Sequence, residues 1–370
     1  MRAAVLWAPG EALKIEEVAT TELGDDEVRV TTRAVGLCHT DLHVIDGSLT
    51  RPTPIVLGHE ASGVVADVGR NVDGITVGDH VVVCLVVHCG ACRWCRRGHF
   101  ALCANRAAAM RPDDAPSRLM CGGRTLHQFT NVGALAEEMV VHRSSVVVVP
   151  EAIPLEVAAL LGCAVVTGFG SVEGVARVQD GEAVVVIGCG GVGLNIVQAA
   201  HAAGAAQVIA VDLDAQRRRR AVEEFGATEA LDGAVGARVG EIVVDMTGGG
   251  ADHVFDAVGL IDTTTLALDL TAPGGAAYAV GIYPEGATVP VAVAHLHAAK
   301  RIVGIRMGDV DPARHIPRLV DRYLDGSLLL DQLITDRVGL DDVNEAFAAL
   351  RAADGTRTVV TFPTPGRGAP

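Results

Sequence analysis

The first part of the chain shows short apolar segments, rich in valine, that are separated by glycine and charged residues. These segments cover residues 28–35, 64–68, 81–87 and 146–149. Short β-branched runs between turn-forming residues are typical of β-strands. The pattern therefore predicts a mostly β domain, which we assign to residues 1–164.

The pattern changes near residue 165. An apolar strand at 183–187 is followed by a glycine-rich turn, a helix at 192–203 and a second strand at 208–211. Further strand–helix units are expected around 241–245, 253–256 and 276–280. This alternation is typical of a doubly wound parallel sheet with helices on both faces. We therefore predict an α/β fold whose parallel-sheet domain covers residues 165–302.

The C-terminal part mixes both kinds of element. Helices are expected at 316–324 and 343–350 and a final strand at 358–362, so we assign residues 303–370 to the mostly β domain. Residues 112–116 and 363–370 contain several prolines and are expected to form a loop and a frayed tail.

Composition restricts the class of protein. Hydrophobic residues make up 49% of the 370 residues, yet the most apolar stretch, 183–194, is twelve residues long and includes four glycines. A membrane-spanning helix needs about 20 apolar residues, so no membrane span is predicted. The net charge of −15 disfavours nucleic acid as a partner. The N-terminus carries no recognisable secretion signal, so we expect nine reduced cysteines in a cytoplasmic protein.

Four cysteines lie close together in the sequence, separated by two, two and seven residues: Cys89, Cys92, Cys95 and Cys103. Such a group is typical of a tetrahedral zinc site. A ferredoxin-type iron–sulfur run is an alternative, but its fourth cysteine follows after three residues and precedes proline, whereas Ala104 follows Cys103. A disulfide pair is a third interpretation. We predict a structural zinc, which has no open position for chemistry.

The glycine-rich turn after the strand at 183–187 matches the pattern G-x-G-x-x-G and opens a helix. It consists of Gly188, Cys189, Gly190, Gly191, Val192 and Gly193. In this context the backbone can approach a pyrophosphate held at the helix N-terminus. Asp212 ends the next strand, where a carboxylate binds an adenosine ribose and repels the 2′-phosphate of NADP. Despite the arginines at 217–220, which could receive that phosphate, NAD is the predicted cofactor.

Further metal-ligand residues are scattered along the chain: Cys38, His59 next to Glu60, and Cys163. A catalytic zinc commonly takes three protein ligands and keeps one position open. Spacing alone does not pair these residues, and a buried structural cysteine is the default interpretation of Cys163.

The residues around His59 match a family signature. It reads Gly58-His59-Glu60, two further residues, Gly63, and then Gly69 after five more. With this signature and the same cysteine gaps, the chain resembles the zinc-containing, medium-chain alcohol dehydrogenase family over essentially its whole length. The resemblance implies a GroES-like fold for the mostly β domain, and two zinc ions, of which Cys38, His59 and Cys163 hold the catalytic one.

The resemblance also implies roles for the neighbours of these ligands. Glu60 would lie behind the metal and ligate it transiently, and Asp41 would orient His59. Thr40 and His43 match the hydroxyl and the imidazole of the family's proton relay. For the cofactor, the family pattern implies contacts from Thr167 to the nicotinamide, Arg217 to the adenosine ribose, and His39 and Arg357 to the pyrophosphate.

The function that follows is hydride transfer between a primary alcohol, or its aldehyde, and NAD. By alignment the substrate pocket would be lined by Leu49, Leu85 and Ile282, which indicates an apolar substrate. A formaldehyde dehydrogenase acting on thiol adducts is an alternative, kept open by Arg106 and Arg111 although Leu49 and Ala107 replace the charged residues expected at its pocket mouth.

An NAD-binding redox sensor without enzyme activity is a further alternative. Such a protein would be expected to lose Thr40, His43 or a zinc ligand, and this chain keeps them all. The remaining cysteines, Cys84, Cys121 and Cys189, are predicted to be dispensable for metal binding.

The segment 104–138 is long, as in the dimeric, long-loop branch of the family, and it predicts a homodimer. In that branch the edge strands of two cofactor sheets pair. We expect the edge at residues 288–291, because Pro290 is tolerated in a strand only at an edge.

Overall fold

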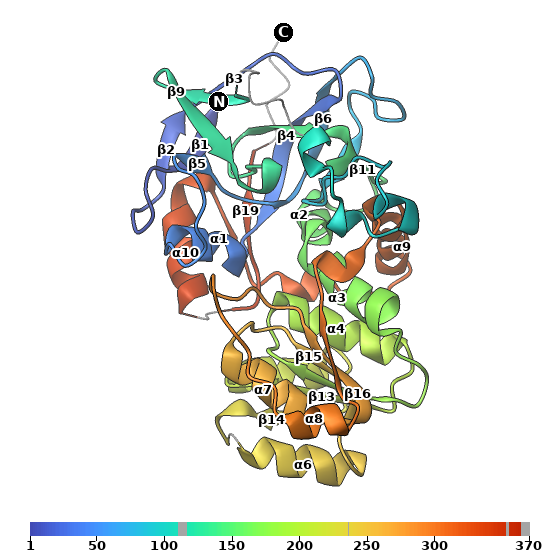
Figure 1. The fold of residues 1–370 in the computed structure, drawn as a ribbon. Coiled ribbons are helices and arrows are strands. Elements are labelled where there is room, and N and C mark those ends of the chain that lie inside the picture. Colours follow the sequence, from blue (N-terminus) through green and yellow to red (C-terminus); the bar gives the residue numbers. More distant parts are fainter. Residues whose placement is uncertain (110–116, 236, 353–354, 364–370) are drawn as a thin grey trace. The chain divides into compact units, whose positions relative to one another are not determined.

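The computed structural model describes residues 1–109, 117–235, 237–352 and 355–363 (Figure 1). The expected loop at 112–116, Arg111, and the tail from residue 364 lie outside the described residues. The chain divides into two compact units. The first unit comprises Met1–Cys163 and Asp311–Pro370, and the second comprises Ala164–Val310.

The first unit is built on two mixed sheets. One has the strand order β2-β1-β5-β9-β8-β3, and the other has the order β11-β7-β6-β4-β19-β18, with β10 also paired to β4. The strands are β1 (Arg2–Leu6), β2 (Lys14–Glu17), β3 (Ala19–Thr20), β4 (Glu27–Gly36), β5 (Ile55–Val56), β6 (Glu60–Val68), β7 (His80–Val83), β8 (Leu119–Cys121), β9 (Arg124–Gln128), β10 (Glu138–His142), β11 (Val146–Val148), β18 (Asp336–Val338) and β19 (Thr358–Thr361).

The helices of the first unit have from five to thirteen residues. They are α1 (His39–Ile45), α2 (Leu155–Ala159), α9 (Pro312–Leu324) and α10 (Val343–Arg351), with 3₁₀ turns that include η1 (Cys95–Arg97), η2 (Phe100–Leu102), η4 (Phe129–Asn131) and η6 (Leu160–Gly162). The core of the unit joins apolar residues of β4, β6 and β7 to those of α1 and α10.

The second unit contains a six-stranded parallel sheet with the order β14-β13-β12-β15-β16-β17. Its strands are β12 (Ala183–Ile187), β13 (Gln207–Asp212), β14 (Glu229–Asp232), β15 (Ala251–Asp256), β16 (Thr271–Ala279) and β17 (Arg301–Gly304). Its helices are α3 (Ala164–Phe169), α4 (Gly191–Ala202), α5 (Ala215–Glu223), α6 (Ala237–Thr247), α7 (Ile261–Leu270) and α8 (Val293–His297), with a π-helix, η7 (Gly170–Ala176), and a 3₁₀ turn, η9 (Met307–Asp309).

The predicted fold class is confirmed, since a mostly β unit accompanies an α/β unit with a doubly wound parallel sheet. Strand β12 coincides with the expected segment 183–187, because its residues are at most partly exposed and Val184–Val186 are fully buried. The second unit continues past residue 302 through β17, which pairs with β16.

Two expected elements differ from the structure. Residues 241–245 lie inside helix α6, because the fully buried Val239 and Val243 are spaced four apart and face the core as one helical stripe. The strand of that unit is β14, whose sequence Glu-Ala-Leu-Asp has little apolar signal. Residues 288–291 form no strand, and the sheet ends instead at β17.

Within the described residues, no single helix is long and apolar enough to cross a membrane. The segments Leu155–Gly162 and Ala164–Ala176 would meet the length and composition test only as a bent pair.

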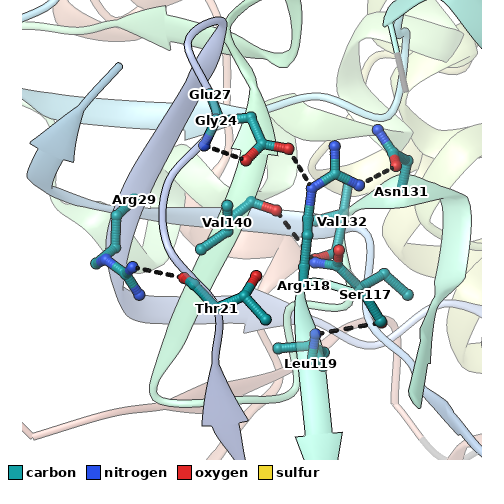
Figure 2. Close-up of polar contacts among 11 residues, drawn as sticks. Thr21, Gly24, Glu27, Arg29, Ser117, Arg118, Leu119, Asn131, Val132 and Val140 are labelled. Carbon is teal, nitrogen blue, oxygen red and sulfur yellow. Dashed lines mark hydrogen bonds and ion pairs between the residues drawn. The ribbon is translucent and has the colours of Figure 1, made fainter. Parts of the chain in front are cut away.

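A buried ion pair joins two distant segments of the first unit. Arg118 Nε donates to Glu27 Oε1 at 2.7 Å, and Arg118 Nη1 donates to Asn131 Oδ1 at 2.7 Å; both contacts are drawn as dashed lines in Figure 2. The other oxygen of Glu27 accepts from the backbone N–H of Gly24 at 2.8 Å. Arg118 therefore ties the turn η4 to the start of β4.

We expect Arg118→Met to lower the free energy of unfolding by about 3–5 kcal/mol, because it removes the cation that pairs with the buried Glu27 carboxylate. The double variant Glu27→Leu with Arg118→Met should lose less, since both members of the ion pair are removed together. Denaturant titration measures both. As a control, Arg70→Met removes the ion pair between Arg70 and Asp25, which has the same 2.7 Å distance but is exposed, and should cost less than about 1 kcal/mol. Equal losses at both sites would contradict this explanation.

Candidate functional site

The four closely spaced cysteines form one cluster in the first unit. Their sulfur atoms all lie within 4.8 Å of one another. The Cys92 sulfur lies 3.5 Å from that of Cys95 and 4.0 Å from that of Cys103, and the Cys103 and Cys89 sulfurs are 3.6 Å apart. A tetrahedral zinc with bonds of about 2.3 Å requires sulfur separations of about 3.8 Å, whereas a disulfide requires about 2.05 Å. The geometry fits a metal and excludes a disulfide here.

Backbone N–H groups in this cluster point at two of the sulfurs. The amide of Cys95 and its neighbours lower the pKa of the Cys92 thiol to about 6, and the amide of Ala91 lowers the pKa of Cys89. Burial and the neighbouring sulfurs instead raise the pKa of Cys95 to about 12. Because the loop already stabilises thiolates at two positions, a metal that binds thiolates suits it.

A second cluster brings together the scattered residues Cys38, His59 and Cys163. Their ligand atoms also lie within 4.8 Å of one another, and all three residues are buried. Cys38 caps α1, His59 precedes β6, and Cys163 follows η6, so three separate segments supply the donors. Two thiols and one imidazole give a metal three ligands and leave a tetrahedral position open.

Asp41 fixes the orientation of the His59 ring. One oxygen of its fully buried carboxylate accepts from His59 Nδ1 at 3.2 Å and from the Gly58 N–H at 2.9 Å. Burial by itself would lower the pKa of His59, but the Asp41 carboxylate and Cys38 outweigh it and raise the pKa. With Nδ1 donating to Asp41, Nε2 is the nitrogen left for a metal.

Glu60 and Arg357 form a buried pair next to the same cluster. Arg357 Nη1 lies 3.3 Å from Glu60 Oε2 and donates to the Leu37 carbonyl at 2.7 Å. Burial opposes the charge on Arg357, but Glu60 and Cys38 outweigh it and raise the pKa of the guanidinium. Gly36 makes room for Glu60, because a Cβ there would lie 2.6 Å from the carboxylate oxygen.

The two cysteines of the cluster share a hydrogen bond. The contact with Cys163 lowers the pKa of the Cys38 thiol, and the same contact raises the pKa of Cys163. Burial adds to the rise at Cys163. Two sulfurs that compete for one proton in a buried site favour a cation between them.

Helix α1 presents two further side chains near Cys38. Thr40 Oγ1 lies 3.5 Å from the Cys38 sulfur, and His43 follows one helical turn later. Residues three apart in a helix lie on one face. The His43 Nδ1 atom is 3.1 Å from Ser48 Oγ, which also lies 3.3 Å from the His43 carbonyl oxygen. His39 is exposed at the start of the helix.

The glycine-rich turn of the second unit is closely packed against itself. Gly188 has φ of 91°, and a Cβ on Gly193 would lie 1.7 Å from the Gly188 carbonyl oxygen. A Cβ on Gly190 would meet nothing within 4 Å. The turn therefore packs tightly against the start of α4 and leaves open space over Gly190, as an anion site at a helix N-terminus requires.

Asp212 stands at the carboxyl end of β13, beside this turn. Its carboxylate accepts from the N–H of Cys189 at 2.7 Å and from the N–H of Asp214 at 2.9 Å. In the neighbouring arginine run, Arg218 donates to the Asp212 carbonyl and pairs with Asp232, while Arg220 pairs with Glu224. These two arginines hold their own helix in place. Arg217 starts the run in the first turn of α5.

Other predicted residues lie as follows. Thr167 is buried in α3, and its hydroxyl donates to the Met307 sulfur at 3.6 Å. Leu49 and Leu85 pack at the margin of the first core, and Ile282 is 45% exposed after β16. The cysteines outside both clusters are buried, and burial raises the pKa of Cys84 to about 12.

Phe129 contacts the candidate metal ligand His59, a contact that the sequence did not predict. Its ring lies edge-on to the His59 ring, with centroids 5.5 Å apart and planes at 82°. The turn η4 that carries it holds Thr130 and Asn131 at positive φ, and Arg118 clamps Asn131 (Figure 2). No spacing or motif in the sequence links Phe129 to His59.

Comparisons with known proteins find matches to both parts of the chain. A family model described as the alcohol dehydrogenase GroES-like domain matches residues 24–151, and one described as zinc-binding dehydrogenase matches residues 191–324. An alcohol dehydrogenase zinc-binding domain protein from Burkholderia ambifaria is 34% identical, with 98% of this chain and 99% of that chain covered and a TM-score of 0.92.

Two further solved structures extend the comparison. Benzyl alcohol dehydrogenase from Acinetobacter calcoaceticus is 29% identical over 98% of this chain and 99% of its own, with a TM-score of 0.92. A protein from Sinorhizobium meliloti described as a zinc-binding dehydrogenase, bound to NADP, is 26% identical over the same shares, with a TM-score of 0.81.

The two glycines of the turn give a test of its packing. Gly193→Ala should lower the free energy of unfolding of the second unit by about 2 kcal/mol or more, because its methyl group collides with backbone. Gly190→Ala is the matched control and should change stability by less than about 1 kcal/mol, since its methyl group meets open space at a φ of −79°. Chemical denaturation compares them, and equal effects would contradict the described packing.

Proposed function

Because the chain belongs to the zinc-containing, medium-chain alcohol dehydrogenase family, we propose that it transfers a hydride between a primary alcohol, or its aldehyde, and NAD. Family membership makes the chain an oxidoreductase. The observation that carries the finer proposal is the buried group of Cys38, His59 and Cys163, three metal ligands with one position left open. The benzyl alcohol dehydrogenase relative supports an apolar primary alcohol as the substrate class.

Two zinc ions fit the two ligand sets. Cys38, His59 and Cys163 would hold one, and the cluster of Cys89, Cys92, Cys95 and Cys103 would hold the other. When bound at the open site, zinc acts as a Lewis acid that lowers the pKa of an alcohol oxygen. Asp41 keeps Nε2 of His59 available as the ligand atom by accepting from Nδ1. Arg357 keeps Glu60 neutralised beside the ligands, since the two form an ion pair.

Thr40 and His43 would move the alcohol proton. The Thr40 hydroxyl lies 3.5 Å from the Cys38 sulfur, so it is next to the ligand set and can accept a hydrogen bond from a substrate hydroxyl. His43 is on the same face of α1, and its ring is held by a hydrogen bond between Nδ1 and Ser48 Oγ. An imidazole can accept a proton as a general base when it lies within hydrogen-bonding reach of the donor.

The second unit would bind NAD. The turn from Gly188 to Gly193, with Gly190, Gly191 and Val192 at the start of α4, would hold the pyrophosphate. Asp212 would bind the adenosine ribose and repel a 2′-phosphate, and Arg217 would lie near that ribose. His39 and Arg357 remain proposed pyrophosphate contacts, and Thr167 a nicotinamide contact. The NADP-bound relative makes the cofactor choice the part to test first.

A homodimer is proposed through strand β17. The sheet ends at this strand, and Ile302 on it is 46% exposed. An uncovered apolar edge strand tends to pair with another chain, and two-fold pairing closes the assembly.

The metal assignment predicts about two zinc ions per chain. Cys163→Ala should lose one zinc and nearly all turnover while it still binds NAD, because the second unit contains no residue of either metal set. Cys84→Ala, which alters a buried thiol of the same unit outside both sets, should keep both zinc ions. Elemental analysis and NADH formation measure this. One metal or fewer per chain, iron with visible absorbance, or normal turnover by Cys163→Ala would refute the assignment.

The cofactor assignment predicts a strong preference for NAD. Asp212→Ser combined with Leu213→Arg should shift the ratio of kcat/KM values towards NADP by on the order of 10- to 100-fold, because a repulsive carboxylate is replaced and a phosphate partner is added. Leu213 is 74% exposed, so the arginine fits without repacking. Leu213→Arg alone is the control. Equal use of NAD and NADP by the unmodified protein would contradict the role of Asp212.

The assembly proposal predicts a solution mass near twice the 38.2 kDa of the chain by light scattering. Ile302→Lys should shift the mass towards one chain, because a charge on the edge opposes strand pairing. A mass near four chains, or a dimer unaffected by Ile302→Lys, would count against pairing through β17.

A further inference from the structure

Asp256 is a buried carboxylate whose hydrogen bonds belong to neither metal cluster. It ends β15, is 0% exposed, and has five hydrogen-bond donor groups 2.7–3.1 Å from its carboxylate oxygens. None of these donors is a charged group. They are the backbone N–H groups of Val258 and Gly259 and the hydroxyls of Thr263, Thr264 and Tyr283.

These bonds join two loops of the second unit. Oδ1 of Asp256 holds the turn at Val258 and Gly259, which follows β15. Oδ2 holds the Tyr283 hydroxyl at 3.1 Å, in the loop that follows β16. The Tyr283 hydroxyl also lies 2.6 Å from that of Thr264, at the start of α7. One carboxylate therefore fixes the loops after two adjacent parallel strands.

The two loops touch backbone to backbone. Gly259 has φ of +88°, and a Cβ there would lie 2.6 Å from the carbonyl oxygen of Ile282. A Cβ on Gly281 would lie 2.3 Å from the Gly259 nitrogen. Val258 also reaches the glycine-rich turn, because its Cγ2 would lie 2.6 Å from a Cβ on Gly188. A shift of either loop would therefore move both Val258 and Ile282.

The position in the sheet indicates what these loops contact. Strand order reverses between β12 and β15, and ligands of doubly wound sheets bind at the carboxyl ends of the strands at that point. Asp212 marks the adenosine side, at the end of β13. The loops after β15 and β16 lie on the opposite side of this reversal from Asp212, which is the side where the nicotinamide nucleotide would bind. Val258 and Ile282 expose 40% and 45% of their surface there, as apolar faces for a ring to contact.

We propose that Asp256, acting through Val258, Gly259 and Tyr283, is a positioning residue that holds the wall of the nicotinamide half of the dinucleotide site. The inference rests on the proposed use of a nicotinamide dinucleotide. Burial raises the pKa of Tyr283 to about 12, so its hydroxyl is neutral and donates at neutral pH. Loops that are already ordered bind a ring without losing further conformational entropy. Loops that are no longer held must lose that entropy at each binding event, which weakens affinity.

Tyr283→Phe tests the proposal, because it removes one donor to Asp256 and keeps the ring. Binding is measured without substrate, with NADH followed by its fluorescence and ADP-ribose by calorimetry. The variant should bind NADH about tenfold more weakly, while its Kd for ADP-ribose stays within about twofold of the unmodified value. Asp256→Asn should show the same selectivity with a larger loss of NADH affinity.

Tyr323→Phe is the matched control. Its hydroxyl donates to Asp331 at 2.9 Å and its pKa is also raised to about 12, but it lies in the first unit. This variant should bind both probes normally. Equal weakening of NADH and ADP-ribose in Tyr283→Phe, or no change in NADH affinity, would overturn the role of Asp256 and leave the proposed function standing. If the unmodified protein bound neither probe, the proposed cofactor would fail, and this inference with it.

Discussion

The organisation of the first unit depends on the burial of Cys38, His59 and Cys163 beside charged side chains. Asp41 and Glu60 are fully buried next to them, and Glu60 forms an ion pair with Arg357. With both cysteines as thiolates, the two sulfurs and the two carboxylates would place four negative groups together in a buried site. Burying unbalanced charge costs several kcal/mol per ion. A divalent cation at the three ligands offsets most of that cost, which is why the electrostatics of the site favour a metal.

The neighbouring structure keeps these ligands in one orientation. Asp41 selects the His59 tautomer, Gly36 leaves room for Glu60, and the Phe129 ring packs edge-on against His59. Phe129 is in turn held by η4, which Arg118 and Glu27 fix from a distance. The second unit repeats this arrangement, because Asp256 holds the loops near the proposed nicotinamide position. In both units, buried hydrogen bonds hold the side chains or loops of the proposed site in one position.

Local patterns were sufficient to predict much of the fold. Strand β12 was predicted at its observed bounds because a strand buried on both faces is apolar throughout. The four-cysteine cluster was predicted because its ligands are close in sequence. Residues 241–245 were misassigned to a strand because their short apolar run is also typical of a strand. In the structure they lie in helix α6, where Val239 and Val243 form one buried face. The prediction of an edge strand at 288–291 was wrong, because the position of a strand in a sheet depends on which strands pair and cannot be inferred from one proline.

Long-range contacts could not be read from spacing. Cys38, His59 and Cys163 come from three separate segments, and only the family resemblance paired them before the structure did. The most direct test of this account is a crystal structure with anomalous diffraction at the zinc edge. It should show one peak among Cys89, Cys92, Cys95 and Cys103, and a second bonded to Cys38, His59 Nε2 and Cys163. A missing second peak, or a metal bonded to His59 Nδ1, would contradict the account.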